Sequence, residues 1–129
     1  MIQVWRNAIW IGVFCAVVIA GAGAAEAAGA IAVGKCSRFG WSNNYKDLND
    51  ARTRALTECA KRGDSTCEIV VTLRQSCGAF AVDEQDRCGA RGWGESGTRE
   101  EAERIARSYC HQRGGKDCKI KHWLCDTKR

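Results

Sequence analysis

Small apolar residues recur at helical spacing in two stretches of this chain and follow the same order in both. Two alanines and a cysteine stand four residues apart, and a second cysteine follows eight residues later. The first set is Ala51, Ala55, Cys59 and Cys67, and adding 51 to each number gives the second set, Ala102, Ala106, Cys110 and Cys118. Residues four apart share one face of a helix. The pattern therefore predicts two helices with a small inner face, and it indicates an internal duplication.

Polar residues mark where each predicted helix begins and ends. Asp47 can accept hydrogen bonds from the first free amides of one helix, and Thr98 with Glu101 has the spacing of a capping box for the other. Gly63 and Gly114 follow the two helices and suit the left-handed turn that ends many helices. Both helices are therefore predicted to lie between these residues.

Three strands are predicted around each helix. Residues 30–33 and 79–82 alternate small and large side chains, which is typical of a short strand with one buried face. Residues around Gly40-Trp41 and Gly92-Trp93 follow and are predicted to complete two hairpins. Residues 68–73 and 119–124 form the third strands, and in the latter Ile120, His122 and Leu124 are expected to share one face.

The predicted fold class is α+β, built from a ββαβ unit that occurs twice. We expect one largely antiparallel sheet of about six strands with both helices packed on one face, stapled by disulfides. The two pseudo-repeats cover about 30–77 and 79–125. Because each has only some 50 residues and no linker separates them, they are expected to form a single domain over 28–129.

Residues 1–27 are typical of a secretory signal peptide. Arg6 supplies the positive charge, residues 8–20 are apolar, and small residues precede a cleavage site near Ala24 to Ala27. The uncharged run 7–25 is also long enough to span a bilayer, so a retained anchor is the alternative. We expect cleavage, a periplasmic or secreted protein, and membrane contact only through the signal segment before cleavage.

Charge and composition say little about the class of binding partner. Twenty lysines and arginines against fifteen acids give a net charge of +5 at pH 7. This charge would suit an acidic protein, an anionic envelope surface or nucleic acid. The basic residues are interleaved with acids and form no basic arm, so nucleic acid is not expected as a partner. The partner is an unidentified protein or envelope component, and the sequence leaves the oligomeric state open.

Eight cysteines remain after the predicted cleavage, and an even number in a small exported chain points to disulfides. The duplication predicts Cys59–Cys67 and Cys110–Cys118, each joining a helix to the next strand. The four others are Cys36, Cys77, Cys88 and Cys125. They pair either as Cys36–Cys88 with Cys77–Cys125, between equivalent points of the two halves, or as Cys36–Cys77 with Cys88–Cys125, within each half. The first arrangement is favoured.

Neither a metal site nor a catalytic site is predicted. Zinc ligands usually come in pairs two to four residues apart, whereas the repeated cysteines are eight apart. His111 follows a cysteine with a structural role, and His122 is predicted to be a packed strand residue. No serine stands in a G-x-S-x-G elbow, and no phosphate-binding loop motif is present. No cofactor is expected, and the protein is predicted not to be an enzyme.

The chain resembles an exported bacterial family called domain of unknown function 4189. The likeness rests on both alanine–cysteine helices, on Cys77-Gly78-Ala79-Phe80-Ala81, on Gly92-Trp93-Gly94, and on Trp123 with Cys125. Cys36 and Cys88 are additional to the usual pattern, and Arg107 stands where Leu56 of the first helix predicts an apolar residue. The resemblance implies export and a duplicated, cysteine-stapled fold, and it implies no activity.

A small exported binding or accessory module of the cell envelope is the leading hypothesis. An inhibitor of an envelope hydrolase, a secreted host-directed factor and a structural or stress-protective protein are the alternatives. Exposed aromatic and arginine side chains anchor many interfaces. The candidate binding surface is therefore predicted at Phe39, Trp41, Arg91, Trp93 and Glu95.

Overall fold

The computed structural model describes residues 27–63 and 66–126. The predicted signal segment lies outside the described residues except for Ala27. Six strands and two helices follow one another as predicted, with one short 3-10 turn, η1 (Lys35–Ser37), between the first two strands. The elements are β1 (Ala28–Val33), β2 (Phe39–Tyr45), α1 (Leu48–Ala60), β3 (Glu68–Arg74), β4 (Cys77–Asp83), β5 (Arg91–Ser96), α2 (Arg99–Gln112) and β6 (Cys118–Cys125).

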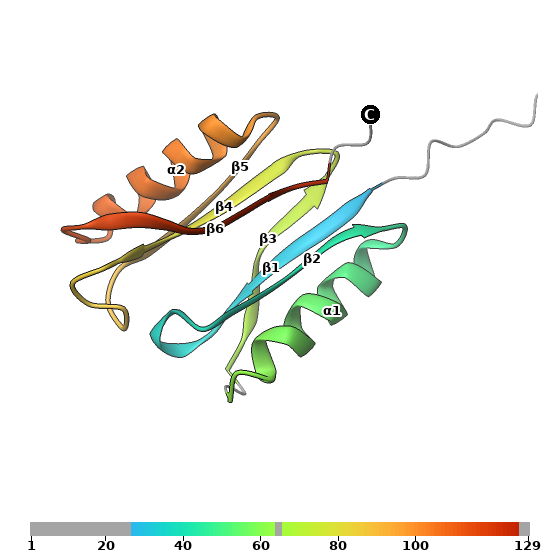
Figure 1. Cartoon of the computed structure of the whole chain (residues 1–129), viewed down its shortest axis with the longest axis horizontal. Helices are drawn as coiled ribbons and strands as arrows, with labels where there is room; N and C mark the ends of the chain where they lie inside the picture. The colour runs from blue at the N-terminus through green and yellow to red at the C-terminus, as the bar shows by residue number, and fades with distance from the viewer. Residues whose placement is uncertain (1–26, 64–65, 127–129) are drawn as a thin grey trace, which may run out of the picture.

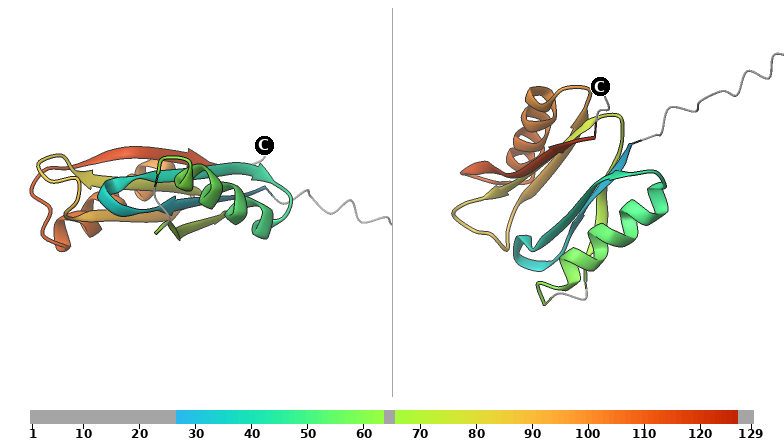
Figure 2. Two further views of the ribbon diagram at one scale, coloured as in Figure 1. Left: turned by 90° about the horizontal axis from the view of Figure 1, so that it is seen from below. Right: turned by 45° about the vertical axis from the view of Figure 1, so that its right-hand side comes forward.

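The six strands form two sheets, which corrects the expectation of a single sheet with both helices on one face. Each sheet has three antiparallel strands, in the order β2-β1-β3 and β5-β4-β6. The α+β class and the repeated ββαβ order are confirmed. Figures 1 and 2 show α1 and α2 on opposite outer sides, with the two sheets packed between them. The molecule is thus a four-layer sandwich of helix, sheet, sheet and helix.

The alternation of small and large residues in the central strands explains these layers. Ala30 and Ala32 of β1 pack against α1, and Ala79 and Ala81 of β4 pack against α2. The large side chains point the other way and meet between the sheets. This central core contains Ile31, Val33, Phe39, Val71, Leu73, Phe80, Val82 and Leu124. Both faces of β1 and β4 are therefore buried, and the expectation of one buried face was wrong.

Glycines in the edge strands let each helix lie directly on its sheet. A Cβ atom at Gly40 would overlap the Ala55 carbonyl oxygen and the Cys59 amide nitrogen of α1. A Cβ atom at Gly92 would overlap the equivalent backbone atoms of Ala106 and Cys110 in α2. The glycine of each Gly-Trp pair is therefore required by the close approach of a helix backbone.

Both predicted N-terminal caps are present. The Asp47 carboxylate accepts hydrogen bonds from the Asn49 and Asp50 amides at 2.6 and 3.2 Å. The Thr98 hydroxyl accepts from the Glu101 amide at 3.3 Å. The carboxylate of Glu101, predicted to return to the Thr98 amide, instead accepts from the Arg104 guanidinium at 2.9 Å.

Replacing Ala106 by leucine is expected to lower the free energy of unfolding by about 1–3 kcal/mol, because α2 leaves no room for a larger side chain above β4 and β5. Ala106 is fully buried between these elements. Urea unfolding of the oxidised protein measures the effect. A leucine variant as stable as the wild type would contradict the close packing of α2.

The favoured disulfide arrangement is confirmed. Cys59–Cys67 and Cys110–Cys118 staple each helix to the strand that follows it. Cys36–Cys88 joins η1 of the first half to the β4–β5 connection of the second. Cys77–Cys125 was expected to join the two halves, but Cys77 is the first residue of β4 and lies opposite Cys125 of the neighbouring strand β6. Cys36–Cys88 is therefore the disulfide that links the halves.

Polar contacts reinforce this link between the halves. The Arg91 guanidinium donates a hydrogen bond to the Gly34 carbonyl oxygen, and the Ser37 hydroxyl donates to the Arg87 carbonyl oxygen at 2.5 Å. In the central core the Phe39 and Phe80 rings lie 5.8 Å apart. Because these contacts span both halves, the described chain forms one packed unit.

Candidate binding face along strands β2 and β6

The five residues predicted as a binding surface do not lie together. Phe39 is buried in the central core, and Arg91 is engaged with Gly34 at the junction of the halves. Trp93 lies on β5, where its ring meets the Tyr109 ring edge-on at 5.2 Å. Glu95 is exposed on the same strand, and Trp41 is exposed on β2. β2 and β5 are edge strands of different sheets, so Trp41 does not lie beside the predicted residues on β5. Of the five, only Trp41 belongs to the surface described next.

Two tryptophans are exposed on adjacent edge strands. Within residues 27–63 and 66–126, Trp41 of β2 and Trp123 of β6 are the large hydrophobic side chains with substantial solvent exposure, 41% and 40%. Contacts between β2 and β6 bring them onto the same side of the sandwich. The Asn43 side-chain amide donates to the Cys125 carbonyl oxygen at 3.3 Å, and the Trp41 ring stacks on His122 with 4.9 Å between centroids.

His122 closes the seam between the two sheets. A shift in the β4–β6 register between Phe80 and Ala81 places Ile120 toward α2, while His122 and Leu124 face the other sheet. The prediction that Ile120 shares a face with His122 was therefore wrong. The His122 ring lies between Trp41 and Phe39, 5.4 Å from the latter, and the Arg62 guanidinium covers Phe39 at 4.8 Å. Burial, and then the positive charge of Arg62, lower the pKa of His122.

Acidification is expected to destabilise the protein through His122. Its folded-state pKa lies below the ordinary value of 6.5, so the unfolded chain takes up the proton first as the pH falls. The contribution of neutral His122 to the free energy of unfolding is therefore complete above about pH 6.5, and it is lost as the pH drops toward the pKa of the folded state. We expect the stability difference between wild type and His122→Gln to shrink between pH 7.5 and pH 5. Urea unfolding at both values measures it, and a constant difference would contradict the prediction.

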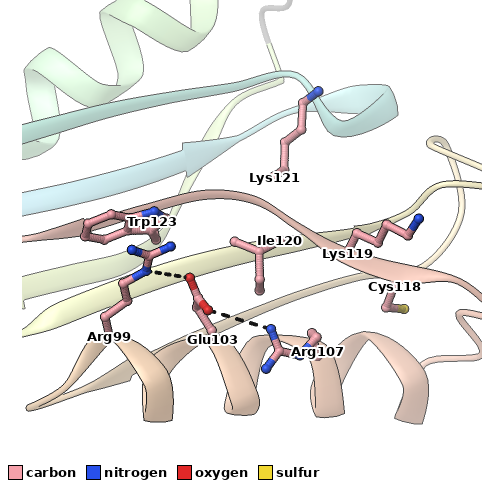
Figure 3. A pocket seen from close by; sticks show the side chains of 8 residues that line it. All are labelled: Arg99, Glu103, Arg107, Cys118, Lys119, Ile120, Lys121 and Trp123. Atoms are coloured by element: carbon pink, nitrogen blue, oxygen red, sulfur yellow. Dashed lines mark hydrogen bonds and ion pairs between the residues drawn. The ribbon is translucent and has the colours of Figure 1, made fainter.

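A groove runs between α2 and β6, next to Trp123 (Figure 3). Its volume is about 520 Å³. Arg99 and Arg107 extend from α2, and both guanidinium groups contact the carboxylate of Glu103, at 2.8 and 3.8 Å. The Arg99 guanidinium lies 3.7 Å from the centre of the Trp123 ring. Figure 3 shows Arg99, Glu103 and Arg107 following one another along the helix on the side that faces β6.

Lysines from β6 and a second hollow extend this basic region. Lys119 and Lys121 line the groove from the strand side, with Lys121 directed away from α2 in Figure 3. A smaller hollow of about 270 Å³ lies between α1 and β2 and contains Trp41, Arg54, Glu58 and Arg62. We call the whole surface the β2–β6 face, defined by Trp41, Trp123, Arg54, Arg62, Arg99, Arg107, Lys119 and Lys121. Its six cations outnumber the three carboxylates paired with them, Glu58, Glu103 and Asp117, so the surface is positive.

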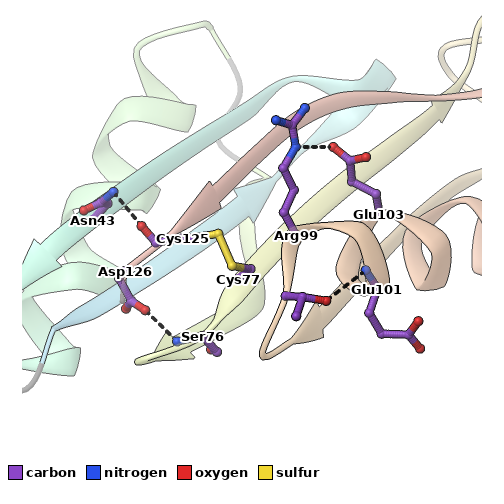
Figure 4. The surroundings of a disulfide bond; sticks show 9 residues. Asn43, Ser76, Cys77, Arg99, Glu101, Glu103, Cys125 and Asp126 are labelled. Carbon is purple, nitrogen blue, oxygen red and sulfur yellow. Dashed lines mark hydrogen bonds and ion pairs between the residues drawn. A yellow bond between two sulfur atoms is a disulfide. The ribbon is translucent and has the colours of Figure 1, made fainter. Parts of the chain in front are cut away.

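Buried polar atoms gather where β6 ends, beside the Cys77–Cys125 disulfide (Figure 4). Asp126 is 1% exposed, and one of its carboxylate oxygens accepts from the Ser76 amide at 2.9 Å. Its other oxygen, the Ser76 hydroxyl and the Asn43 side-chain oxygen are buried without a hydrogen-bond partner among the residues described. Burial raises the pKa of Asp126. Glu95 is exposed, but partial desolvation of its carboxylate, followed by the charge of Asp126, raises its pKa as well.

The described residues contain no set of three or more histidine, cysteine or acidic side chains placed to hold a metal ion. Their cysteines are all joined in disulfides. His111 is exposed, and its Nδ1 lies 2.9 Å from the Gly115 carbonyl oxygen. No helix within the described ranges has the length and apolar character needed to cross a membrane. The chemistry that the β2–β6 face offers is charge pairing through guanidinium and ammonium groups, and stacking on indole rings.

Sequence reasoning identified Trp41 but missed the other residues of the β2–β6 face. Lys119, Lys121 and Trp123 alternate on one strand, which indicated a strand near solvent but not which helix lies beside it. The mismatch between Leu56 and Arg107 was the available signal, because a charged residue replaces an apolar one at a repeated position. Only the packing of α2 against β6 brings these residues into one groove.

Comparison with known proteins agrees with this architecture. The solved structure "NMR structure of Rv1813c from Mycobacterium tuberculosis" is similar to this chain, with a TM-score of 0.54 and 29% sequence identity. The likeness covers 77% of this chain and 74% of that one. A search of curated proteins finds no match. The model of the family described as Domain of unknown function (DUF4189) matches residues 28–125, and the chain belongs to this family.

Proposed function

We propose that this protein is an exported binding module of the cell envelope, which contacts its partner through the β2–β6 face and carries out no catalysis. One observation carries the proposal. Trp41 and Trp123 remain 41% and 40% exposed on adjacent edge strands of a domain that buries its other described large hydrophobic side chains wholly or in part. Exposed aromatic side chains framed by arginines mark many interaction surfaces.

The four disulfides support a place outside the cytoplasm, because such bonds persist in oxidising compartments. Within the proposal, the protein acts in the periplasm or after secretion, once its leader has been removed. The Cys36–Cys88 disulfide and the contacts between β2 and β6 hold the two halves together, which favours binding as a rigid body. Little conformational entropy is then lost on association.

Cleavage of the leader is expected after Ala24. Ala27 and Ala28 are both 1% exposed, and the Ala27 carbonyl oxygen accepts a hydrogen bond from the Gln75 amide at 3.3 Å. A cut after Ala27 would remove this contact and leave a charged amino group on the first residue of β1. Mass spectrometry of the exported protein should find Ala25 at its amino terminus, and an intact leader would contradict the cleavage.

The binding proposal is tested by comparing how single variants associate with isolated envelope fractions. Immobilised oxidised wild type should retain a saturable component, and Trp41→Ala or Trp123→Ala should lose it. Thr72→Ala, a change on β3 at the position that corresponds to Trp123, is the control and should behave as wild type. Equal retention by all four proteins, or no saturable component at all, would overturn the proposal. Turnover of an envelope polymer by the wild type would instead identify an enzyme.

A further inference from the structure

We propose that the groove between α2 and β6 binds an acidic polysaccharide. This inference rests on the proposed function and names the chemical class of its partner. The carbohydrate would lie along the groove, with its anionic groups on the arginines and lysines and one sugar ring against Trp123. The groove differs from the equivalent place in the other half of the same chain.

The two halves share one backbone plan, so their residues can be matched one by one. The register shift between β1 and β3 lies at Ile31/Ala32, and that between β4 and β6 lies at Phe80/Ala81. Residues of α2 and β6 then correspond to residues of α1 and β3 with numbers lower by 51. On the helix side of the groove, the residues that correspond to Arg99, Glu103 and Arg107 are Leu48, Arg52 and Leu56. On the strand side, the residues that correspond to Lys119, Lys121 and Trp123 are Glu68, Val70 and Thr72.

The first half closes this place with apolar side chains. Leu56, Cys67 and Ile69 pack together against the alanines beneath α1. In the second half Cys118 and Ile120 keep their places, but Arg107 replaces the leucine and turns to Glu103. The same fold is therefore stable with an apolar contact at this position. Stability of the fold does not require the guanidinium group, and this points to a different role for it.

The charge of the groove is both high and unbalanced. Four cations line it and Glu103 is the one carboxylate among the lining residues. When Asp117, 3.9 Å from the Lys119 ammonium, is counted as well, a net charge of +2 remains, whereas the corresponding residues of the first half balance. Arg99 and Arg107 are eight residues apart on α2, a separation of about 12 Å along the helix axis. Cations spread over this length suit a chain with several negative groups better than a single small anion.

The strand side of the groove argues against a peptide as the occupant. A peptide would most readily add to the free edge of β6 through backbone hydrogen bonds. Lysines and an irregular register are features that protect edge strands from such pairing, and β6 has both. This protective role accounts for Lys119 and Lys121 alone. It accounts neither for the two arginines on α2 nor for the exposed indole of Trp123.

Trp123 selects a ligand that contains rings. Its indole is 40% exposed at one end of the groove, although the Arg99 guanidinium lies over it. The C–H face of a sugar ring stacks on an indole, whereas polyphosphate or an acidic side chain has no such face. Nucleic acid also combines rings with negative charge, but the disulfides indicate an oxidising compartment outside the cytoplasm. An acidic polysaccharide satisfies charge, shape and compartment together.

Titration calorimetry of the oxidised protein with an oligogalacturonate, which has one carboxylate on every sugar, tests the inference. A neutral oligosaccharide of the same length, polyphosphate, polyglutamate and single-stranded DNA are the comparison ligands. We expect saturable binding of the oligogalacturonate that weakens with added salt. The neutral sugar should not bind, and the other anions should bind more weakly.

The first half of the chain supplies the variants. The double change Arg107→Leu with Lys121→Val installs the first-half residues and should weaken binding about tenfold, whereas Arg52→Leu removes one charge from α1 and should leave the affinity unchanged. Trp123→Thr should reduce binding of the oligogalacturonate but not the weak binding of polyphosphate. Thermal melting of each variant shows whether it is folded. If the double variant melts early, Arg107→Gln alone gives the test, because this side chain lies in the groove beside Glu103, and it should weaken binding by a smaller factor than the double change.

The outcomes separate this inference from the proposed function. No binding of the oligogalacturonate, equal or tighter binding of another anion, or an equal loss in Arg52→Leu would overturn the polysaccharide site. If envelope retention still depends on Trp41 in that case, the binding module stands and its partner is of another class. If that retention also fails, both proposals fall.

Discussion

Gly92→Ala is expected to lower the free energy of unfolding by about 3 kcal/mol or more, at the upper end of the range for overpacked cores. The new methyl group would overlap the Ala106 carbonyl oxygen and the Cys110 amide nitrogen, and it would lie 3.0 Å from the Cys110 Cα atom. These are backbone atoms in the middle of α2. Because Cys110 is also tied to Cys118, the helix cannot move away without disturbing β6.

A glycine in open space provides the control for this prediction. A Cβ atom at Gly97 would meet no other atom within 4 Å, so Gly97→Ala should leave stability nearly unchanged. Urea unfolding of both variants under oxidising conditions gives the comparison. Gly40→Ala should repeat the large effect in the first half, where the Ala55 carbonyl oxygen stands in the way. Similar stabilities for Gly92→Ala and Gly97→Ala would mean that α2 does not lie on β5 as described.

Removing the Cys36–Cys88 disulfide, by changing both residues to serine, is expected to destabilise the protein by about 4 kcal/mol. The bridge spans 52 residues, and the entropy that a cross-link removes from the unfolded chain grows with the length of the loop. Both cysteines are exposed, so serine is tolerated at these positions and leaves no cavity in the core.

The short helix–strand disulfides provide a comparison for the stability lost with Cys36–Cys88. Cys59–Cys67 spans only eight residues, and its loss is expected to cost about 2.5 kcal/mol from chain entropy alone. A variant that replaces the buried Cys59 by alanine also loses packing contacts. The two disulfide variants are therefore compared by their change in unfolding entropy as well as by the midpoint of unfolding. If loss of Cys36–Cys88 destabilised the chain by less than about 1 kcal/mol, the unfolded halves would have to be close together already.

Much of the local structure could be predicted from single residues. Ala51, Ala55 and Cys59 are all fully buried on the inner face of α1, as their spacing indicates. Asp47 and Thr98 cap the helices because their side chains can reach amides that the first helical turn leaves free. The cysteine pairing favoured by the duplication is also the observed one.

The number of sheets could not be predicted, because it depends on where large side chains are buried rather than on their order. Ile31 and Phe80 alternate with alanines, and this pattern is equally compatible with a strand that faces solvent on one side. In the structure both residues are completely buried between the sheets. The clue was the size difference: alanines suit a helix that lies close, whereas the larger residues fill the space between two sheets.

The candidate face was harder to predict than the fold. Trp41 and Trp93 occupy matching places in the repeat, so the sequence pattern predicts the same environment for both side chains. Trp41 lies exposed beside His122, whereas Trp93 is partly buried against the central core and Tyr109. The difference arises from how the two sheets pack, which no local pattern encodes. Trp123 gains its importance in the same way, from α2 lying next to β6.

The exposed Cys36–Cys88 bridge has a consequence for how this molecule responds to thiols. Cys59 and Cys110, by contrast, are completely buried in their own halves. Cys36 and Cys88 are both exposed, whereas Cys67, the partner of Cys59, is only partly exposed and Cys118, the partner of Cys110, is buried. A small thiol is therefore expected to reduce Cys36–Cys88 faster than either helix–strand disulfide. The β2–β6 face includes side chains from both halves. Reduction of the Cys36–Cys88 disulfide would therefore be expected to affect this face before either half unfolds.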